Sequence, residues 1–220
     1  MINLIIADSA LELIPEEIAN HPTVRATASR RGKIASKCLL DASLHHSAMS
    51  SLPLSDRRGR PDIVHFCLLL AFDSIVNRKG EMRVYVHTIG DNVIHFDRRI
   101  RLPKNYNRFT GLVESLLAEG EISSEGKRLA WVENMSLPVF VKSLNAPVFI
   151  FSESGMPVSS FHFLKDSEEV TLVVGGFPHG DYLSDIKAIG GSTISIYGEK
   201  MMAWSVVATI LCQLHQTMPD

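Results

Sequence analysis

Residues 169–181, EVTLVVGGFPHGD, constrain the fold of this chain more than any other stretch. Residues 170–174 form a short apolar run rich in β-branched side chains, which is typical of a strand buried on both faces. Gly175 and Gly176 end the run and remove side chains where another group approaches the backbone closely. Two glycines alone would favour a plain tight turn. Because open α/β sheets bind ligands at the carboxyl ends of strands, the added Phe-Pro-His-Gly favours a ligand-binding loop.

Strand-like and helix-like segments alternate along the rest of the chain. The strand-like segments are residues 2–7, 82–88, 92–96, 129–132, 147–151, 170–174 and 193–197, and the helical ones are residues 34–49, 63–75, 109–118, 137–144, 182–188 and 201–216. This alternation predicts an α/β domain with a mostly parallel sheet flanked by helices. The 220 residues, 45% of them apolar, suffice for one domain with a large core. The hairpin at 82–96 and the basic connector that follows it look like an insertion in the alternation.

Composition and cysteine usage indicate a cytoplasmic protein without a membrane span or a metal site. We expect no span, because no apolar run reaches roughly 18 residues, and no signal peptide, because the N-terminus lacks a basic segment. Cys38, Cys67 and Cys212 lack metal-ligand spacing and are expected to be buried thiols, and this odd, low count fits a reducing compartment. His45 and His46 have no carboxylate or cysteine at ligand spacing, so we expect a helix-end or surface role for them.

The net charge of −2 hides two halves of opposite sign. Residues 1–108 hold 16 Lys and Arg against 11 Asp and Glu, a charge of +5, whereas residues 109–220 hold 6 against 13, a charge of −7. Polyanion binding depends on local charge. The first half is therefore where a nucleic-acid surface is expected.

The densest basic segment is the connector, RRIRLPKNYNR at 98–108, which is followed by Phe109. It places five cations within eleven positions, together with Tyr106, and few acids accompany them. Clustered cations attract phosphates, and aromatic rings stack on bases. This pattern favours an RNA surface over a solvated charged loop.

A second charged motif is Arg60-Pro61-Asp62. Proline fixes its own φ and restricts the residue before it, so the two charged side chains leave a stiff turn. On these residues alone the motif reads as a helix start, with Asp62 near the positive helix end and Arg60 solvated.

Five motifs in a fixed order resemble one family. They are RGRPDIVHFCLL at 58–69, YVHTIGDNVI at 85–94, RLPKNYNRFTGL at 101–112, VVGGFPHGD at 173–181 and ISIYGEKMMAW at 194–204. Together they resemble the ribosomal small-subunit pseudouridine N1-methyltransferases, a ribosome-biogenesis family of the SPOUT superfamily of knotted methyltransferases. The resemblance spans nearly the whole chain, and the compact length is similar to that of archaeal members.

The resemblance implies a fold that composition does not show. It implies a single SPOUT-type domain over residues 1–220, with an inserted hairpin and RNA-binding connector at about 82–108. It also implies a C-terminal trefoil knot in a cofactor-binding part at about 147–216; true knots are rare, so only the family likeness supports this expectation. A homodimer built partly on the final helix is implied as well, and ribosomal proteins of the small subunit are potential further partners.

The same resemblance implies S-adenosylmethionine as the cofactor and assigns residues to its site. Glycines after the strand at 170–174 border the ligand, and residues 194–201 form a second wall. Residues 152–155, SESG, follow another strand and are a candidate third side. The expected cofactor-binding residues are Val174, Gly175, Gly176, Gly180, Ile194, Ser195, Ile196, Tyr197, Gly198, Glu199 and Met201.

The resemblance further implies rRNA contacts by Arg60, Arg101, Lys104 and Arg108. Lys104 stands where the family more often has arginine; it keeps the charge and loses the bidentate fork. Arg60 and Asp62 are the implied catalytic pair, with Arg60 stabilising negative charge on the reacting base. Asp62 either orients Arg60 or accepts a proton, and we prefer orientation because a salt-bridged carboxylate is a poor base.

The implied function is methylation of N1 of a pseudouridine in small-subunit rRNA, with a role in small-subunit biogenesis. Two alternatives stay open. One is a SPOUT methyltransferase that acts on tRNA, and the other is a non-catalytic assembly factor that binds pre-rRNA. A small-molecule α/β enzyme ranks lower, since it would leave the connector's cations without a purpose.

Overall fold

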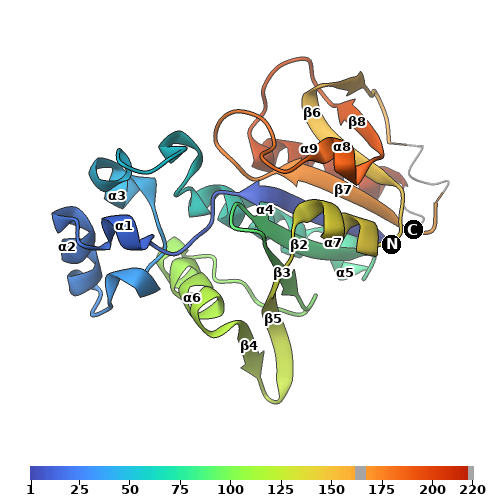
Figure 1. Ribbon diagram of the computed structural model, residues 1–220. Coiled ribbons are helices and arrows are strands. Elements are labelled where there is room, and N and C mark those ends of the chain that lie inside the picture. Colours follow the sequence, from blue (N-terminus) through green and yellow to red (C-terminus); the bar gives the residue numbers. More distant parts are fainter. Residues whose placement is uncertain (162–166, 218–220) are drawn as a thin grey trace.

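The computed structural model describes residues 1–161 and 167–217 (Figure 1). Within this part, eight strands form one sheet in the order β4-β5-β3-β2-β1-β7-β6-β8. In chain order the strands are β1 (Ile2–Ser9), β2 (Met82–Thr88), β3 (Asn92–Phe96), β4 (Glu121–Ser124), β5 (Lys127–Asn134), β6 (Val148–Pro157), β7 (Val170–Gly175) and β8 (Ser192–Ser195). Neighbours from β2 to β8 are parallel and those from β4 to β2 are antiparallel. The predicted α/β fold with a mostly parallel sheet is confirmed.

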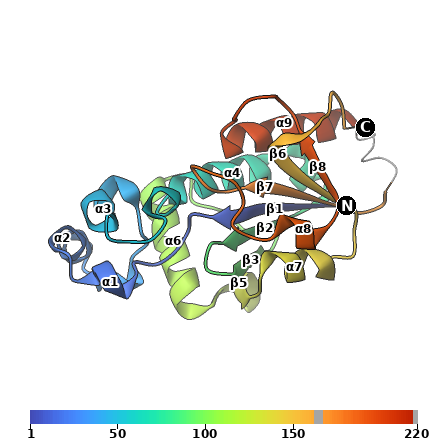
Figure 2. The ribbon, with the colours of Figure 1, turned by 45° about the horizontal axis from the view of Figure 1, so that its top comes forward.

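Helices cover both faces of the sheet. They are α1 (Glu16–Ala19), α2 (Pro22–Arg30), α3 (Ala42–Met49), α4 (Pro61–Asp73), α5 (Ile75–Arg78), α6 (Tyr106–Glu119), α7 (Leu137–Ser143), α8 (Ile186–Ile189) and α9 (Ala203–Thr217), with short 3₁₀ helices η1 (Ala35–Lys37) and η2 (Ser55–Arg57). Figure 2 shows α4 and α9 on one face, α7 and α8 on the other, and α1 to α3 as a lobe at one end.

The alternating side chains of β7 join two separate cores. Leu172 and Val174 pack into the core that contains α4 and α9, whereas Val173 packs into the core that contains α7 and α8. All three side chains are at most 2% exposed. The prediction of a strand buried on both faces is therefore confirmed, and the strand lies between β1 and β6.

The structure differs from the prediction of one helix over residues 34–49. That stretch holds η1, an extended segment in which Leu39 bridges to Leu13, and then α3. Asp41 stops any helix from running through, because it is the N-cap of α3 and its carboxylate accepts the Ser43 backbone N–H at 2.9 Å. Sequence analysis also missed α2 and β4, and the helix expected at 182–188 is confined to Ile186–Ile189.

The hairpin at 82–96 is also placed differently from the prediction. Its strands are integral to the central sheet, because β2 pairs in parallel with β1 and β3 continues the sheet toward β5. Only the connector after β3 leaves the sheet. Within the expected cofactor-binding part at 147–216, residues 162–166 lie outside the described residues.

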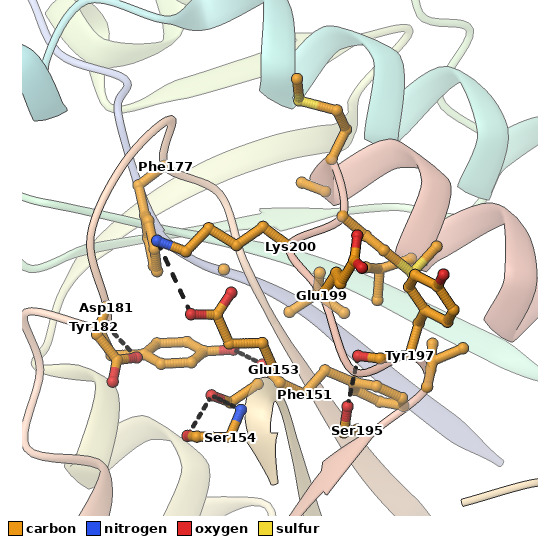
Figure 3. Close-up of a pocket in the computed structure, with 18 of the residues that line it drawn as sticks. Phe151, Glu153, Ser154, Phe177, Asp181, Tyr182, Ser195, Tyr197, Glu199 and Lys200 are labelled. Carbon is orange, nitrogen blue, oxygen red and sulfur yellow. Dashed lines mark hydrogen bonds and ion pairs between the residues drawn. The ribbon is translucent and has the colours of Figure 1, made fainter. Parts of the chain in front are cut away.

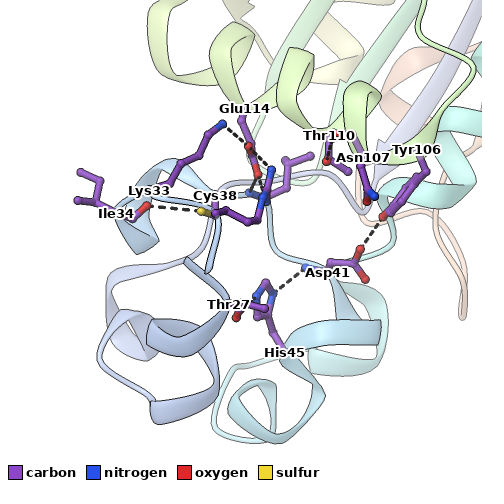
Figure 4. A network of polar contacts seen from close by, with 12 residues as sticks. Thr27, Lys33, Ile34, Cys38, Asp41, His45, Tyr106, Asn107, Thr110 and Glu114 are labelled. Atoms are coloured by element: carbon purple, nitrogen blue, oxygen red, sulfur yellow. Dashed lines mark hydrogen bonds and ion pairs between the residues drawn. The ribbon is translucent and has the colours of Figure 1, made fainter. Parts of the chain in front are cut away.

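A buried carboxylate attaches the N-terminal lobe to α6 (Figure 4). Glu114, only 1% exposed, accepts hydrogen bonds from Arg31 at 2.6 and 2.7 Å, from Lys33 at 2.7 Å and from the Leu39 N–H at 3.0 Å. Burial raises the pKa of Glu114, but these donors outweigh it and leave the pKa below its ordinary value. The lobe is thus held to the sheet-flanking helix by charge-assisted bonds.

Two side-chain expectations in this region are corrected. His45 is buried: its Nδ1 accepts the Asp41 N–H at 3.1 Å and its Nε2 lies 3.2 Å from Thr27 Oγ1, which excludes a surface role. Cys38 and Cys67 are buried as expected, whereas Cys212 is exposed on α9. Among the described residues, no helix is both long and apolar enough to span a bilayer.

Replacing Gly111 with alanine should stabilise the protein. Gly111 lies inside α6, and a Cβ added there meets no atom within 4 Å. Alanine in a helix interior is better than glycine by about 0.5–1 kcal/mol. For a domain of this size a gain of that order raises Tm by about 2–4 °C, which calorimetry measures.

The matched control is Gly120 at the end of the same helix. Gly120 has φ +82°, in the left-handed region, so Gly120→Ala should lower Tm. A rise in Tm for Gly120→Ala, or a fall for Gly111→Ala, would contradict this reading of the helix.

Candidate functional site

A cavity of about 710 Å³ lies at the C-terminal ends of three parallel strands (Figure 3). Its walls come from β6, from the end of β7 and the loop after it, from the end of β8 and the loop after it, and from the start of α9. Ligand sites of this size and position are typical of open α/β sheets. The glycine-edged loop and the segment after residue 194 thus share one cavity.

The cavity brings together most of the expected cofactor-binding residues. Those that line it are Val174, Gly175, Gly180, Ile194, Ser195, Ile196, Tyr197, Glu199 and Met201. Gly176 and Gly198, both described, lie outside the lining. Ser152, Glu153 and Ser154, from the third side considered for the site, also line the cavity, as does Phe177 of the ligand-binding loop. Phe151 and Tyr182 line it too and had not been assigned from the sequence.

The two glycines after β7 have different neighbours. A Cβ on Gly175 would lie 2.6 Å from the Phe177 ring, so the missing side chain lets that ring fold back over the strand end. A Cβ on Gly176 would lie 2.4 Å from Ser9 Oγ and 2.8 Å from Ile6 Cγ2. Gly176 therefore serves the close approach of the loop to β1, and its role at the cavity is indirect.

Tyr182 fixes the other end of the loop that follows β7. Its hydroxyl is 2.9 Å from the carbonyl oxygen of Phe151 and 3.2 Å from that of Val173. Its ring meets Phe177 edge to face at 5.4 Å. The loop is thereby closed on itself by a Phe–Tyr pair and tied to both β6 and β7.

A buried aspartate holds the next two residues. Asp8, 1% exposed at the end of β1, accepts hydrogen bonds from the Leu183 N–H at 2.6 Å, the Ser184 N–H at 2.9 Å and the Ser184 hydroxyl at 2.6 Å. Its own N–H donates to His87 Nδ1 at 3.3 Å, and His87 Nε2 lies 3.2 Å from Asp91 Oδ1. Asp8 had not been predicted as a site residue. The signal that could have identified it is a carboxylate directly after the predicted strand at residues 2–7.

Removing the Asp8 charge should destabilise the protein in a pH-dependent way. Burial raises the pKa of Asp8, but the adjacent His87 ring, whose Nδ1 lies 3.4 Å from Asp8 Oδ1, and the hydrogen bonds from Ser184 outweigh it, and the pKa lies below its ordinary 3.8. Bonds to a buried carboxylate contribute about 2 kcal/mol, so Asp8→Asn should lower the unfolding free energy by about that amount at pH 7. Because the folded-state pKa is depressed, this contribution is present above pH 3.8 and is lost as pH falls through the folded value.

Urea titrations of both proteins at pH 7, 5, 4 and 3 measure this difference. The gap between wild type and Asp8→Asn should be constant from pH 7 to 5 and narrow below about pH 4. A gap that is the same at pH 3 as at pH 7 would show that the Asp8 charge is not what matters.

Two pairs of polar side chains lie among the residues that line the cavity. Glu153 and Lys200 form a loose ion pair at 3.8 Å across it, and Ser152 and Ser154 share a hydrogen bond of 3.0 Å (Figure 3). The His179 side chain lines the cavity and forms no hydrogen bond with a described residue.

Arg60 and Asp62 form the charged pair that the resemblance implied, whereas the local motif alone indicated a solvated Arg60. Arg60 Nε and Nη2 donate to Asp62 Oδ1 and Oδ2, both at 2.8 Å, and the side chains are 34% and 33% exposed. Arg60 is the N-cap residue of α4, with Pro61 at the first helical position. The hydrogen bond to Asp62 raises the pKa of Arg60, which keeps the guanidinium charged. The pair is half-exposed and available to a ligand.

The basic connector is held against helix α4 about one turn after Asp62. His65 Nε2, on α4, lies 2.8 Å from the Pro103 carbonyl oxygen, and its ring stacks on Phe109 at 4.3 Å. Arg101, Lys104 and Arg108 are exposed, and no described residue forms an ion pair with them. Helix α4 therefore carries the Arg60–Asp62 pair at its start and holds the basic connector beside it.

The remaining connector cations differ from these three. Arg99 is engaged by Asp97 in a two-point contact at 2.8 Å, and Arg98 lines a separate cavity beside β2. The five cations of the connector therefore do not act as one cluster.

The aromatic rings expected to stack on bases beside the connector are placed differently. Phe109 is 0% exposed, which excludes that role, and Tyr106 contacts Asp41, a residue that no motif assigned. The Tyr106 hydroxyl donates to Asp41 Oδ2 at 2.6 Å, and burial together with this bond raises its pKa, so the phenol stays neutral. Both groups interact electrostatically with Arg60, so they belong to its surroundings. Among the described residues, no group of three or more His, Cys, Asp or Glu is placed to hold a metal ion.

Comparison with known proteins matches nearly the whole chain. The family model described as EMG1/NEP1 methyltransferase covers residues 4–215. A protein of Thermococcus kodakarensis named ribosomal RNA small subunit methyltransferase Nep1 is 46% identical over 215 residues, 96% of each chain. A protein of the same name from Methanothrix thermoacetophila is 42% identical over 212 residues, 96% of this chain and 94% of that one.

A solved structure is similar over the same length. The crystal structure of Archaeoglobus fulgidus Nep1 bound to S-adenosylhomocysteine has a TM-score of 0.89 and 38% identity, and the match covers 98% of this chain and 97% of that one.

Proposed function

Because the chain belongs to the EMG1/NEP1 methyltransferase family, we propose that it methylates small-subunit rRNA with S-adenosylmethionine, at N1 of a pseudouridine. The observation that carries this proposal is the shared cavity of the glycine-edged loop and the segment after β8. The relative with a similar fold holds the demethylated product of that cofactor.

The residues of the cavity fit S-adenosylmethionine. Ile194, Ile196 and Met201 supply an apolar wall for an adenine ring, and the loops supply backbone groups at hydrogen-bonding range. Glu153 and Glu199 are carboxylates suited to an ammonium group and to ribose hydroxyls. When bound, the cofactor supplies a methyl group on a sulfonium, which needs no further activation.

The chain's own residues align and stabilise the reacting base. Pseudouridine exposes an N1–H because its sugar is attached through carbon, and the base has to leave its stack to reach the cavity. Loss of the N1 proton to solvent leaves negative charge on N1 and on the neighbouring carbonyl oxygens, where Arg60 supplies a fixed cation. As N1 is aligned with the methyl group, the N1–C bond forms while the S–CH₃ bond breaks, which leaves a neutral methylated base and a neutral thioether.

Asp62 positions Arg60 in this scheme. Its two oxygens are both engaged by the Arg60 guanidinium, at 2.8 Å each, so it presents Arg60 in one orientation. A carboxylate held in this way is a weak base. The exposed cations Arg101, Lys104 and Arg108 then bind the backbone of the RNA that flanks the reacting base.

The experiment that tests the function is mass spectrometry of defined RNAs after incubation with the protein and S-adenosylmethionine. Four substrates are compared: a small-subunit rRNA hairpin and a tRNA, each with uridine or pseudouridine at the target position. Methylation of the pseudouridine hairpin alone supports the proposal. Methylation of the tRNA would replace it, and binding without methylation would favour an assembly factor.

A homodimer is part of the proposal. An apolar surface joins α4 and α9: Phe66 is 51% exposed, Leu70 38% and Met202 60%, and Trp204 contacts Phe66 at 5.4 Å. A second copy of the chain would cover it, burying apolar area that a monomer leaves in water. Light scattering should give twice the chain mass of 24.4 kDa, and Leu70→Asp should halve the measured mass. A monomeric wild type would contradict the proposal.

We extend the proposal to the family's knotted topology, with the trefoil knot in residues 147–216. Support comes from the family membership. The arrangement of β6 between β7 and β8 is compatible with it. A cytoplasmic location and contacts with ribosomal proteins belong to the same proposal.

A further inference from the structure

The three arginines of residues 57–60 reach three different parts of the molecule. Arg58 makes a two-point contact with Glu12 at 2.8 and 2.5 Å, and Arg60 makes one with Asp62. Arg57 points away from both and reaches the cofactor cavity. Nothing in the function proposed above uses Arg57.

Arg57 packs on the loop after β7. Its guanidinium carbon lies 4.8 Å from the centre of the Phe177 ring, and its Nη2 donates to the Asp181 carbonyl oxygen. A Cβ on Gly180 would lie 2.9 Å from its Nη1, so the glycine makes room for the guanidinium. Phe177, Gly180 and Asp181 all line the cavity (Figure 3). The Arg57 side chain thus contacts Phe177 and Asp181 on the cavity wall, and Gly180 leaves room for it.

The base of the loop that carries Arg57 is firmly held. The Gly59 carbonyl accepts the Ala42 N–H at 2.8 Å, and the Arg60 N–H donates to the Ala10 carbonyl at 2.9 Å. The Arg58–Glu12 pair is only 15% and 18% exposed, so it is little weakened by solvent. Arg57 and Arg60 thus lie three residues apart on one segment that is anchored to Ala42, Ala10 and Glu12.

The contact between Arg57 and the loop after β7 leaves one donor of the guanidinium without an acceptor. The Nε–H of Arg57 is buried and has no hydrogen-bond partner among the described residues. A buried donor without an acceptor costs free energy, so the contact favours any loop position that supplies one. A ligand in the cavity touches the same loop and therefore biases its position.

We propose that Arg57 is a positioning residue that couples the cofactor cavity to the RNA-contacting loop. The inference rests on the proposed function and goes beyond it. A ligand in the cavity orders the loop after β7, and Arg57 transmits that order to the segment that presents Arg60. Cofactor occupancy then increases RNA affinity, and by linkage RNA increases cofactor affinity by the same factor.

The test measures the coupling factor itself. The dissociation constant of a pseudouridine-containing small-subunit rRNA hairpin is determined with and without saturating S-adenosylhomocysteine, which cannot react. For wild type we expect the product to tighten RNA binding about 5–10-fold, within the range of typical allosteric couplings. For Arg57→Ala the ratio should fall to about 1–2, and Arg57→Lys should restore part of it, since lysine keeps the cation over the ring.

Two further variants separate coupling from general effects. Arg78→Ala removes the same charge from an exposed pair, 69% exposed at Arg78, and should keep the wild-type ratio. Phe177→Leu removes the ring from the opposite side of the contact and should lower the ratio as Arg57→Ala does. Phe177→Leu also tests the coupling on its own if Arg57→Ala does not fold.

The outcomes distinguish this inference from the function on which it rests. A wild-type ratio near 1, or an unchanged ratio in both Arg57→Ala and Phe177→Leu, overturns the coupling while hairpin methylation still supports the function. The coupling is also overturned if Arg57→Ala weakens RNA binding equally with and without S-adenosylhomocysteine. Arg57 would then act only as a phosphate contact. A wild type that binds neither probe overturns both.

Discussion

Replacing Arg60 with alanine is expected to reduce the methylation rate at saturating RNA and S-adenosylmethionine by about 10²–10³-fold. A fixed donor aimed at charge that develops in the transition state is typically worth that factor. Arg60 is held for this task by Asp62, at 2.8 Å on both sides of the guanidinium fork. Single-turnover kinetics on the pseudouridine hairpin measures the rate, and Arg78→Ala is the charge-matched control.

Asp62→Asn separates orientation of Arg60 from proton removal. Asparagine keeps one acceptor and loses the charge-assisted second bond, so we expect a loss of about tenfold with Arg60 still present. If Asp62 only orients Arg60, the shape of the pH–rate profile is unchanged. A profile that loses its acidic limb would instead assign proton transfer to Asp62, and a full rate with an unchanged profile would exclude both roles.

Replacing Gly155 with alanine is expected to weaken binding of S-adenosylhomocysteine by about 10–100-fold. A Cβ at Gly155 would lie 2.5–2.7 Å from three backbone atoms of Ile194, and both residues belong to the paired strands β6 and β8. Backbone cannot move aside as a flexible side chain does, so the strands have to separate. Overpacking of this kind costs about 1–3 kcal/mol, and the part expressed in binding changes affinity tenfold for every 1.4 kcal/mol.

Isothermal titration calorimetry measures this affinity, and Gly111→Ala is the control because its added Cβ meets no atom within 4 Å. Ile194 lines the cavity, so separation of the strands displaces the wall directly. Wild-type affinity in a folded Gly155→Ala protein would mean that the wall of β8 does not contribute to binding.

Local patterns predicted the parts of the fold that depend on neighbours in sequence. The run at 170–174 identified a strand buried on both faces, and the structure places it inside the sheet, between β1 and β6. The apolar pattern of residues 63–75 and the alternation at 82–96 gave α4 and the β2–β3 hairpin. Failures occurred where a single polar side chain sets an element's start, as at Asp41, whose side chain caps the first turn of α3.

The functional site likewise has a part that local motifs predicted and a part that depends on distant segments. The motifs placed nine of the eleven expected cofactor-binding residues on the cavity. They did not show that Gly176 faces Ser9 or that Asp8 holds residues 183 and 184, because these contacts join the first strand to a loop about 170 residues later.

The strand–helix alternation, the glycine-edged loop and the charged Arg60–Asp62 turn could all be predicted from the chain, since each depends on residues a few positions apart. Which of these features meet in space follows from how distant segments pack. Packing of β7 between β1 and β6 brings the loop at 177–181 beside Arg57, and α4 places Arg60 and the connector side by side. The physical reason is that such contacts arise when distant segments bury their apolar faces together, and no local pattern records which faces will be joined.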